Sequence, residues 1–208
     1  MAIEIQDPEL KEMFKHGLYF HGHLCPAMPL GLRAGLLARR KLGVGRSQDK
    51  ELMLLAETAE GHAMACFLDG VMMATGCTYG KGNCKKLRYG KLAFILIDTK
   101  GKKQIRVSVK AEFILQALKT SPFIAQRKMG VPPQEVEREL AEAAVNKVIN
   151  LPEEEIFNIG EVAPYESETV RGTFEAYPCE KCGEVVYAKW IRVKDGKFYC
   201  IPCSGYKD

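Results

Sequence analysis

Apolar residues recur every three or four positions through much of the chain, the spacing of helices that pack one face against a core. Helices are predicted over residues 8–19, 29–42, 63–75, 111–129 and 133–149. The third is apolar on almost all sides, which predicts a central position in the fold. Gly31 and Gly35 lie four residues apart in the second helix and would allow another element to approach closely.

Shorter apolar runs between turn residues predict strands at residues 52–56, 91–98 and 104–109. Residues 151–170 contain six acidic and no basic side chains and mark a boundary, part of which is a strand. From residue 172 onward, short strands surround pairs of cysteines. We therefore predict an α+β fold. It has a mixed helix-and-sheet main domain over residues 1–165 and a small zinc-ribbon module, treble-clef-like, over residues 166–208.

The C-terminal module contains two Cys-x-x-Cys pairs separated by seventeen residues. Two residues between thiolates let one tight turn present both sulfurs to a metal at about 2.3 Å, and two such turns complete a tetrahedron. Asp195-Gly196 predicts a type I′ hairpin turn between the pairs. Four thiolates leave no open position, so we predict a structural zinc ion; two disulfides or a redox pair are the alternative. The predicted ligands are Cys179, Cys182, Cys200 and Cys203.

The aromatic residues of this module permit two interpretations. Tyr187, Trp190 and Tyr199 could stack on nucleic-acid bases. They could equally cover the small core, which is the interpretation that we favour. Residues 171–208 carry seven Lys and Arg against five Asp and Glu, so charge gives nucleic-acid binding only weak support.

A second group of metal-binding residue types lies near the N-terminus, in a segment predicted to be irregular from His16 to Pro29. His21, His23 and Cys25 alternate, and the proline after Cys25 favours extended backbone. An extended segment would point all three side chains to the same side. Imidazole with thiolate suits zinc or another transition metal, or a cysteine activated by a neighbouring imidazole. The alternative is two loop histidines and a buried structural thiol.

Two further segments contain residues that could complete a site. Cys66 and Asp69 are three apart on the apolar third helix, where a carboxylate is unexpected unless paired. His62 precedes that helix and could join the site or cap the helix. In the glycine-rich loop of residues 76–83, backbone N–H groups, Lys81 and Cys77 could hold a small anionic ligand. An ordinary glycine-rich turn is the alternative.

Together these segments resemble the FmdE family of formylmethanofuran dehydrogenase proteins. The resemblance rests on H-G-H-x-C-P at His21–Pro26, on Cys66 with Asp69, on T-G-C-T-x-G-K-G-N at Thr75–Asn83, and on the strand led by Gly90-Lys91. It covers most of residues 10–150, and some members also carry a C-terminal zinc ribbon. Ala27 replaces the usual glycine, and His62 and Cys84 are additions. The resemblance implies a site formed by His21, His23, Cys25, Cys66, Asp69, Cys77 and Lys81.

The family is named for its association with molybdenum- or tungsten-dependent formylmethanofuran dehydrogenase in one-carbon metabolism, in which it is not the catalytic component. We therefore expect a metal-binding protein with a His/Cys cleft that binds a second zinc or other transition metal, or acts on a small anionic substrate. The alternative is a regulatory or assembly protein whose zinc module contacts nucleic acid or a partner protein. Whether the cleft is enzymatic is left open.

Composition adds limits to this picture. The net charge of +4 over 208 residues is mild and does not by itself indicate a nucleic-acid partner. The longest clear apolar run, residues 92–97, is far shorter than a membrane span, and no export signal is visible. We therefore expect a cytoplasmic protein without a membrane partner. The apolar third helix and the close-packing glycines favour a homodimer.

Overall fold

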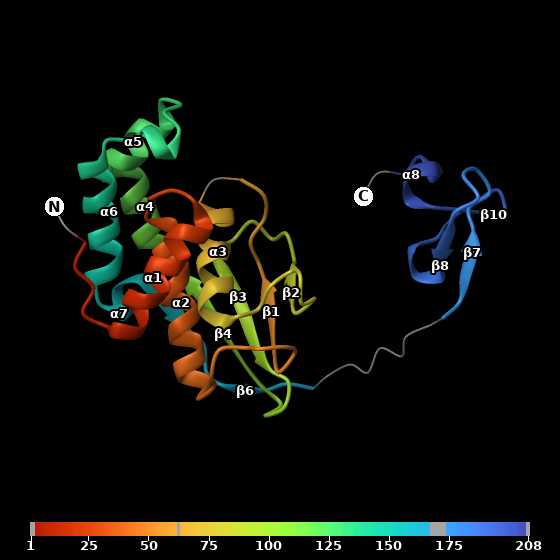
Figure 1. Cartoon of the computed structure of the whole chain (residues 1–208), viewed down its shortest axis with the longest axis horizontal. Coiled ribbons are helices and arrows are strands. Elements are labelled where there is room, and N and C mark those ends of the chain that lie inside the picture. Colours follow the sequence, from red (N-terminus) through yellow and green to blue (C-terminus); the bar gives the residue numbers. More distant parts are fainter. Residues whose placement is uncertain (1–2, 62, 167–173, 207–208) are drawn as a thin grey trace. The chain divides into compact units, whose positions relative to one another are not determined.

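Helices and a mixed sheet form the first compact unit of this computed structural model, residues 1–167, and residues 168–208 form a second unit that contains short strands (Figure 1). The structure describes residues 3–61, 63–166 and 174–206. The predicted α+β class, with a small C-terminal cysteine module, is confirmed. His62, a possible site residue, lies outside the described ranges. In those ranges, no helix is both long and apolar enough to cross a bilayer.

The first unit is built on a six-stranded sheet with the order β2-β1-β3-β4-β5, in which β6 also pairs with β4. β2 runs parallel to β1, and the other pairs are antiparallel. Leu54, Leu96 and Ile105 face one another across neighbouring strands and are buried. The strands are β1 (Leu52–Ala56), β2 (Cys84–Lys86), β3 (Ala93–Asp98), β4 (Lys103–Val109), β5 (Phe157–Ile159) and β6 (Ala163–Pro164).

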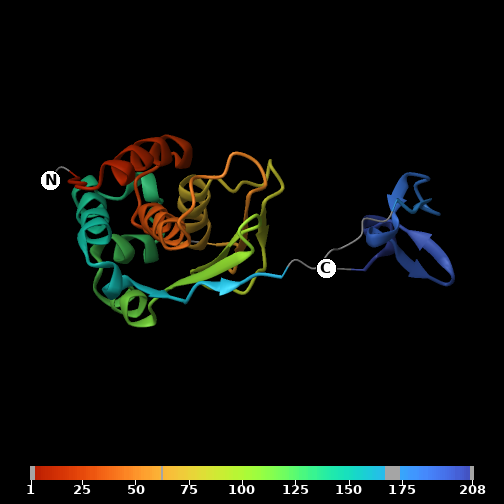
Figure 2. The same cartoon turned by 90° about the horizontal axis from the view of Figure 1, so that it is seen from below.

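The longer N-terminal helices lie on one side of this sheet, as Figure 2 shows for the red and orange segments above the green strands. The α-helices are α1 (Pro8–His21), α2 (Ala27–Leu42), α3 (Met64–Thr75), α4 (Ala111–Thr120), α5 (Pro122–Lys128), α6 (Arg138–Asn150) and α7 (Glu153–Ile156), with a short 3-10 turn at Pro133–Glu135. α2 and α3 bury residues against the sheet, so α3 is central, as predicted.

Glycine determines how closely α2 and α3 approach each other. A Cβ atom on Gly31 would lie 1.9 Å from the Phe67 carbonyl oxygen, and one on Gly70 would lie 2.0 Å from the Met28 carbonyl oxygen. Real side chains cannot occupy such positions, so the backbones touch where the glycines meet. The predicted close approach at Gly31 is confirmed. Because the contact lies within one chain, these glycines give no support to a dimer.

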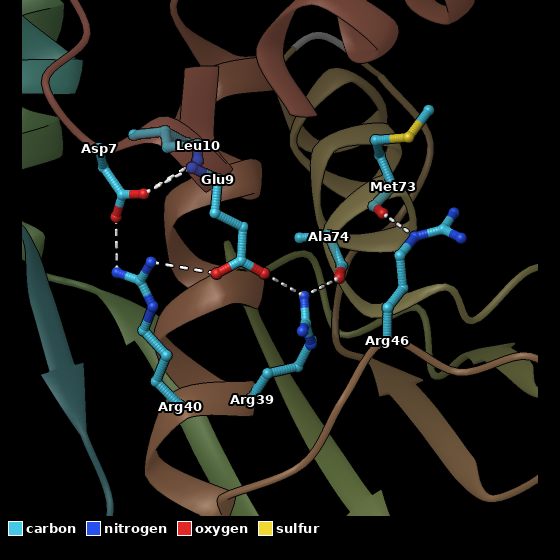
Figure 3. Close-up of polar contacts among 8 residues, drawn as sticks. All are labelled: Asp7, Glu9, Leu10, Arg39, Arg40, Arg46, Met73 and Ala74. Atoms are coloured by element: carbon cyan, nitrogen blue, oxygen red, sulfur yellow. Dashed lines mark hydrogen bonds and ion pairs between the residues drawn. The ribbon is translucent and has the colours of Figure 1, made fainter. Parts of the chain in front are cut away.

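Polar contacts hold α1 against α2 and α3 (Figure 3). Asp7 caps α1 by accepting hydrogen bonds from the backbone N–H groups of Glu9 and Leu10, and it pairs with Arg40 at 2.7 Å. The buried Arg39 donates to Glu9 at 3.0 Å and to the carbonyl of Ala74 in α3 at 3.1 Å. These contacts fix α1 relative to α3, and both helices supply site residues.

The long helix predicted over residues 111–129 is two helices. Ser121 has extended backbone (φ −79°, ψ 119°), because the residue before a proline is driven out of the helical region. Its hydroxyl then caps α5 by accepting from the N–H of Ile124. Similarly, the helix predicted over 133–149 is a 3-10 turn followed by α6. These breaks turn the chain so that α4, α5 and α6 surround a cavity.

The second unit consists of two strand pairs and a short helix. β7 (Ala176–Pro178) pairs with β8 (Val185–Tyr187), and β9 (Arg192–Lys194) pairs with β10 (Lys197–Tyr199). Asp195 and Gly196 both have positive φ, 50° and 73°, as the predicted type I′ turn requires. A 3-10 turn at Ala188–Trp190 follows β8. The last helix, α8, covers Ile201–Ser204.

Candidate metal centres

The first candidate centre begins where α1 ends. Gly22 adopts the left-handed conformation (φ 85°) and donates its N–H to the Leu18 carbonyl, so His21 is the last helical residue. The prediction of an extended segment from His21 to Cys25 is therefore wrong. The αL turn at Gly22 replaces it as the reason why His21 and His23 point toward each other.

The turn gathers three donor atoms and α3 supplies a fourth. The Nε2 atom of His21 lies 3.2 Å from Nε2 of His23 and 3.5 Å from Sγ of Cys25. With Cys66, these residues place four potential ligand atoms within 4.8 Å of one another. Two imidazole nitrogens and two sulfurs form the kind of donor set that binds zinc and related transition metals. The residues present therefore fit a metal ion.

Asp69, one helical turn from Cys66, orients the imidazole ring of His21 through a hydrogen bond to Nδ1. The Nδ1 atom of His21 donates to the Asp69 carboxylate at 2.8 Å, which leaves Nε2 facing the other donors. Metal-binding histidines commonly donate their second ring nitrogen to a carboxylate in this manner, which fixes the ring and its tautomer. The arrangement thus has both ligands and a positioning carboxylate.

The electrostatics of the cluster favour an ionised sulfur. A hydrogen bond from the Cys25 thiol, followed by His21, lowers the pKa of Cys66 to about 4. The same shared proton raises the pKa of Cys25. Asp69, followed by Cys66, raises the pKa of His21 to about 9, whereas burial lowers the pKa of His23. The lowered pKa of Cys66 favours its thiolate, the form in which cysteine binds metals.

The cluster forms part of the wall of a cavity of about 600 Å³. His23, Cys25 and Cys66 face this cavity, and α5 supplies much of the remaining wall. Ala63, also on the wall, has a φ of 65°, a conformation that is uncommon for a residue with a side chain. Strained backbone of this kind is frequent at functional sites. Because His23, Cys25 and Cys66 line the cavity, the donor group is accessible to a small molecule from it.

Some wall residues were not predicted from the sequence. Phe123, Arg127 and Lys128 belong to α5, about one hundred residues from His23 in the chain. Arg127 and Lys128 end an amphipathic helix, where basic residues are ordinary, so only the three-dimensional structure reveals their place.

Cys77 and Lys81 are placed differently from the other predicted site residues. Cys77 is fully buried in the core between the helices and the sheet, and burial raises its pKa to about 11. The Lys81 ammonium donates to the carbonyls of Ser47 and Gln48 at 3.0 and 3.2 Å. Their substrate-binding roles remain predictions, and these contacts favour structural roles. Cys84 is also buried, and burial raises its pKa to about 12.

The second candidate centre is formed by the C-terminal cysteines. Cys179, Cys182, Cys200 and Cys203 bring their sulfurs within 4.8 Å of one another, and all are free thiols. Backbone N–H groups of Cys182 and Cys200 lower the pKa of Cys179 to about 6. Four convergent sulfurs fit a metal ion with closed tetrahedral coordination, which is typical of a structural site.

The aromatic side chains around this centre are largely exposed. Tyr187 is 60% exposed and Trp190 is 56% exposed, so the interpretation that both cover the core of the module is wrong. The rings of Tyr177 and Phe198 contact each other with centroids 4.7 Å apart. Tyr199 is half-buried. Trp190 ends the short 3-10 turn that follows β8.

Comparison with a family model shows the family of this chain. The model of the FmdE family, described as "FmdE, Molybdenum formylmethanofuran dehydrogenase operon", matches residues 20–158. A protein of Archaeoglobus fulgidus described as a probable S-adenosyl-L-methionine-binding protein is 36% identical over 198 residues, covering 89% of this chain. The chain spans about half (50%) of that relative.

The fold has a counterpart among crystal structures. A tungsten formylmethanofuran dehydrogenase FmdE-like protein from Syntrophus aciditrophicus superposes with a TM-score of 0.59 and 21% identity. The match covers 99% of this chain and 97% of that one. This similarity shows a shared fold.

Proposed function

The chain belongs to the FmdE family, and from this premise we propose that its main unit binds one transition-metal ion, zinc in the first instance. The ligands are His21, His23, Cys25 and Cys66. The observation that carries this proposal is the convergence of their four donor atoms within 4.8 Å. The hydrogen bond of 2.8 Å between His21 and Asp69 supports it, because it orients His21 toward the other donors.

The position of the cluster supports a functional role for the ion. Three of the four ligands line the cavity, so a molecule in the cavity lies next to the centre. A zinc ion bound there would supply Lewis-acid chemistry. The residues of the chain position it: Asp69 holds His21, and burial keeps Cys25 in place at 4% exposure. The small anionic substrate expected from the sequence would enter by this cavity.

Metal counting on the whole chain tests this proposal. We expect two metal ions per chain in the wild type and one in the His23→Ala variant, with the remaining ion in the cysteine module. His16→Ala is the matched control, because His16 is exposed on α1 and pairs only with Glu12 among its described contacts. One ion per chain in both wild type and His23→Ala would contradict the proposal.

The family description supports a biological setting. We propose that the protein acts alongside a molybdenum- or tungsten-dependent formylmethanofuran dehydrogenase in one-carbon metabolism, in the cytoplasm. S-adenosyl-L-methionine, named for the Archaeoglobus protein, carries a sulfonium cation. In the described structure the cavity walls contain basic side chains and no Asp or Glu, which disfavours a cationic ligand there.

A second candidate function rests on the exposed aromatic residues of the C-terminal unit. The Lys189 ammonium lies 5.6 Å from the centroid of the Trp190 ring, and Tyr187 is exposed nearby in sequence. Exposed aromatic rings with basic neighbours suit nucleic-acid bases or a partner protein. Binding to single-stranded RNA should weaken steeply with added salt if this candidate is correct. No binding at low salt would exclude the nucleic-acid version.

A further inference from the structure

The cavity beside the His/Cys cluster adjoins a second cavity. The second, of about 270 Å³, shares four wall residues with the first, so the two adjoin. The shared residues are Pro26, Ala27, Ala63 and Ile124. We call the pair the double cavity. The larger part has a volume within the range of about 300–1,000 Å³ that is usual for small-molecule sites.

The second cavity, which we call the inner part of the double cavity, is lined mostly by apolar residues. They include Leu30, Leu92, Leu140, Val148 and Phe113 of α4. No residue of α4 is buried, although the helix is rich in apolar side chains. Binding of an apolar molecule is favourable here, because it displaces water from an apolar wall.

Basic side chains stand at both parts of the double cavity. Lys128 lines the part next to the cluster, and its ammonium donates to the Leu118 carbonyl at 2.7 Å, a neutral partner that leaves its charge in place. Arg127 lies beside it, and Lys147 lines the inner part. Among the described wall residues there is no Asp or Glu. The charges therefore favour an anionic group over a cationic one.

We propose that the double cavity binds an amphiphilic carboxylate, with its apolar body between α4 and α6 and its carboxylate at the cluster end, near Lys128. The proposal rests on the proposed function, because it names the ligand class of that site. Two independent features define the class: the apolar walls select the body, and the basic side chains at the cluster end select the head. A fully polar anion would not displace water from the apolar wall, and an uncharged lipid would not place an anionic group near Lys128.

Calorimetric titration of the whole chain with simple probes tests the ligand class. Decanoate should bind about 250-fold more tightly than hexanoate, because it buries four more methylenes and each is worth roughly fourfold in affinity. Decan-1-ol should bind more weakly than decanoate because it has no charge. Equal affinity for decanoate and hexanoate, or no binding of decanoate, would overturn the inference.

Substitutions in the cavity walls test where decanoate binds. Ala117→Trp on α4 and Ala143→Trp on α6 each place a large ring in the inner part and should weaken decanoate at least tenfold. Leu115→Trp is the matched control, since Leu115 is 55% exposed on the same helix and does not line the cavity. Lys128→Ala should weaken decanoate several-fold and leave decan-1-ol unchanged, whereas Lys119→Ala on the neighbouring helix should change neither.

Metal content, measured on the same samples, separates this inference from the proposed function. Two metal ions per chain without decanoate binding would overturn the inference and leave the metal proposal intact. Decanoate binding to a chain that lacks the cluster metal would support the ligand class and contradict the metal proposal. If Ala117→Trp and Ala143→Trp alter the oligomeric state and leave decanoate affinity unchanged, another protein chain covers the cavity and the inference is wrong.

Discussion

Asp69 decides how His21 presents its ring to the cluster. Its carboxylate accepts the Nδ1 proton at 2.8 Å, so Nε2 is left to face Cys25 and His23. Asp69→Asn keeps the shape of the side chain and removes its charge. We predict that zinc affinity at this centre falls ten- to a hundredfold, as is usual for such partners, while the cysteine module keeps its metal.

Competition with a chromogenic chelator would measure this loss. Glu12→Gln is the matched control, because Glu12 also pairs with a histidine of α1, His16, at 2.7 Å but in an exposed position. Similar losses in both variants would show that the effect is not specific to the cluster.

Glu57 makes the free energy of unfolding of the main unit depend on pH. Its buried carboxylate accepts two hydrogen bonds from Arg106, at 2.6 and 2.8 Å, and lies 3.7 Å from Lys91. Arg106 lowers the pKa of Glu57 in the folded state. A carboxylate with a lowered folded pKa stabilises the fold above its unfolded pKa and loses that contribution as pH falls through the folded value.

We therefore predict that Glu57→Gln lowers the free energy of unfolding by about 1–2 kcal/mol at pH 7. The difference from the wild type should shrink as the pH falls through the lowered pKa of the folded state, where the native carboxyl also becomes neutral. Urea unfolding at several pH values measures it, and the exposed Glu139→Gln provides the baseline. A difference that stays constant from pH 7 to pH 3 would contradict the assignment.

At the scale of residues, the sequence identifies ligand types better than it identifies geometry. The alternating His21, His23 and Cys25 are close in the chain, so their convergence could be predicted locally. Cys66 and Asp69 share a helix face for the same local reason. Lys128 could not be predicted, because its place beside the cluster depends on how α5 folds back across about one hundred residues.

At the scale of elements, glycine controls the contact between α2 and α3. A Cβ atom on Gly70 would lie 2.0 Å from the Met28 carbonyl oxygen and 2.6 Å from the Leu32 nitrogen. Neither backbone atom can move without separating the helices. We predict that Gly70→Ala destabilises the main unit by about 3 kcal/mol, at the upper end of ordinary overpacking effects.

Thermal or urea unfolding measures this effect. Gly80→Ala is the control, since nothing lies within 4 Å of a Cβ atom at Gly80. It should change the free energy of unfolding by less than about 1 kcal/mol. A Gly70→Ala variant as stable as the control would mean that the two helices pack less closely than described.

Helices and strands could be predicted wherever apolar residues follow a regular spacing, as in α2, α3 and β1. Element ends depended on single residues whose effects are harder to weigh. Ser121 and Pro122 divide one predicted helix into α4 and α5, and Gly22 ends α1 only after His21. The three-residue β2 was not predicted, because it gains its strand geometry by pairing with β1. Tertiary pairing of this kind leaves little trace in local pattern.

At the scale of the whole molecule, the two units should respond separately to loss of metal. The second unit has little apolar core, so its folding should depend on the four-cysteine centre. We predict that Cys200→Ser collapses the dispersed amide NMR signals of residues 174–206 into the range of an unfolded chain. The unfolding temperature of the main unit should not change.

Val193→Ser is the control for this experiment, because Val193 is 57% exposed on β9 and is not among the four cysteine ligands. Loss of ordered signals in both units after Cys200→Ser would show that the units fold together. The homodimer expected from the sequence remains a prediction, and sedimentation analysis of the wild type would test it.

The family and the cysteine module could be predicted from the sequence because both rest on fixed spacings. The double cavity could not, since α4, α5, α6 and the start of α2 each contribute a few ordinary apolar residues to it. Any one of these residues alone resembles core. That they line one cavity can be recognised only in the structure, where the cluster and the basic side chains lie on the same walls.

X-ray absorption at the zinc edge tests the central claim most directly. The sample is the whole chain carrying serine at Cys179, Cys182, Cys200 and Cys203 and loaded with zinc, so that the main-unit centre alone contributes. We predict one zinc per chain with two sulfur ligands at about 2.3 Å and two nitrogen ligands at about 2.0 Å. No bound zinc, or a shell of oxygen and nitrogen without sulfur, would contradict the account.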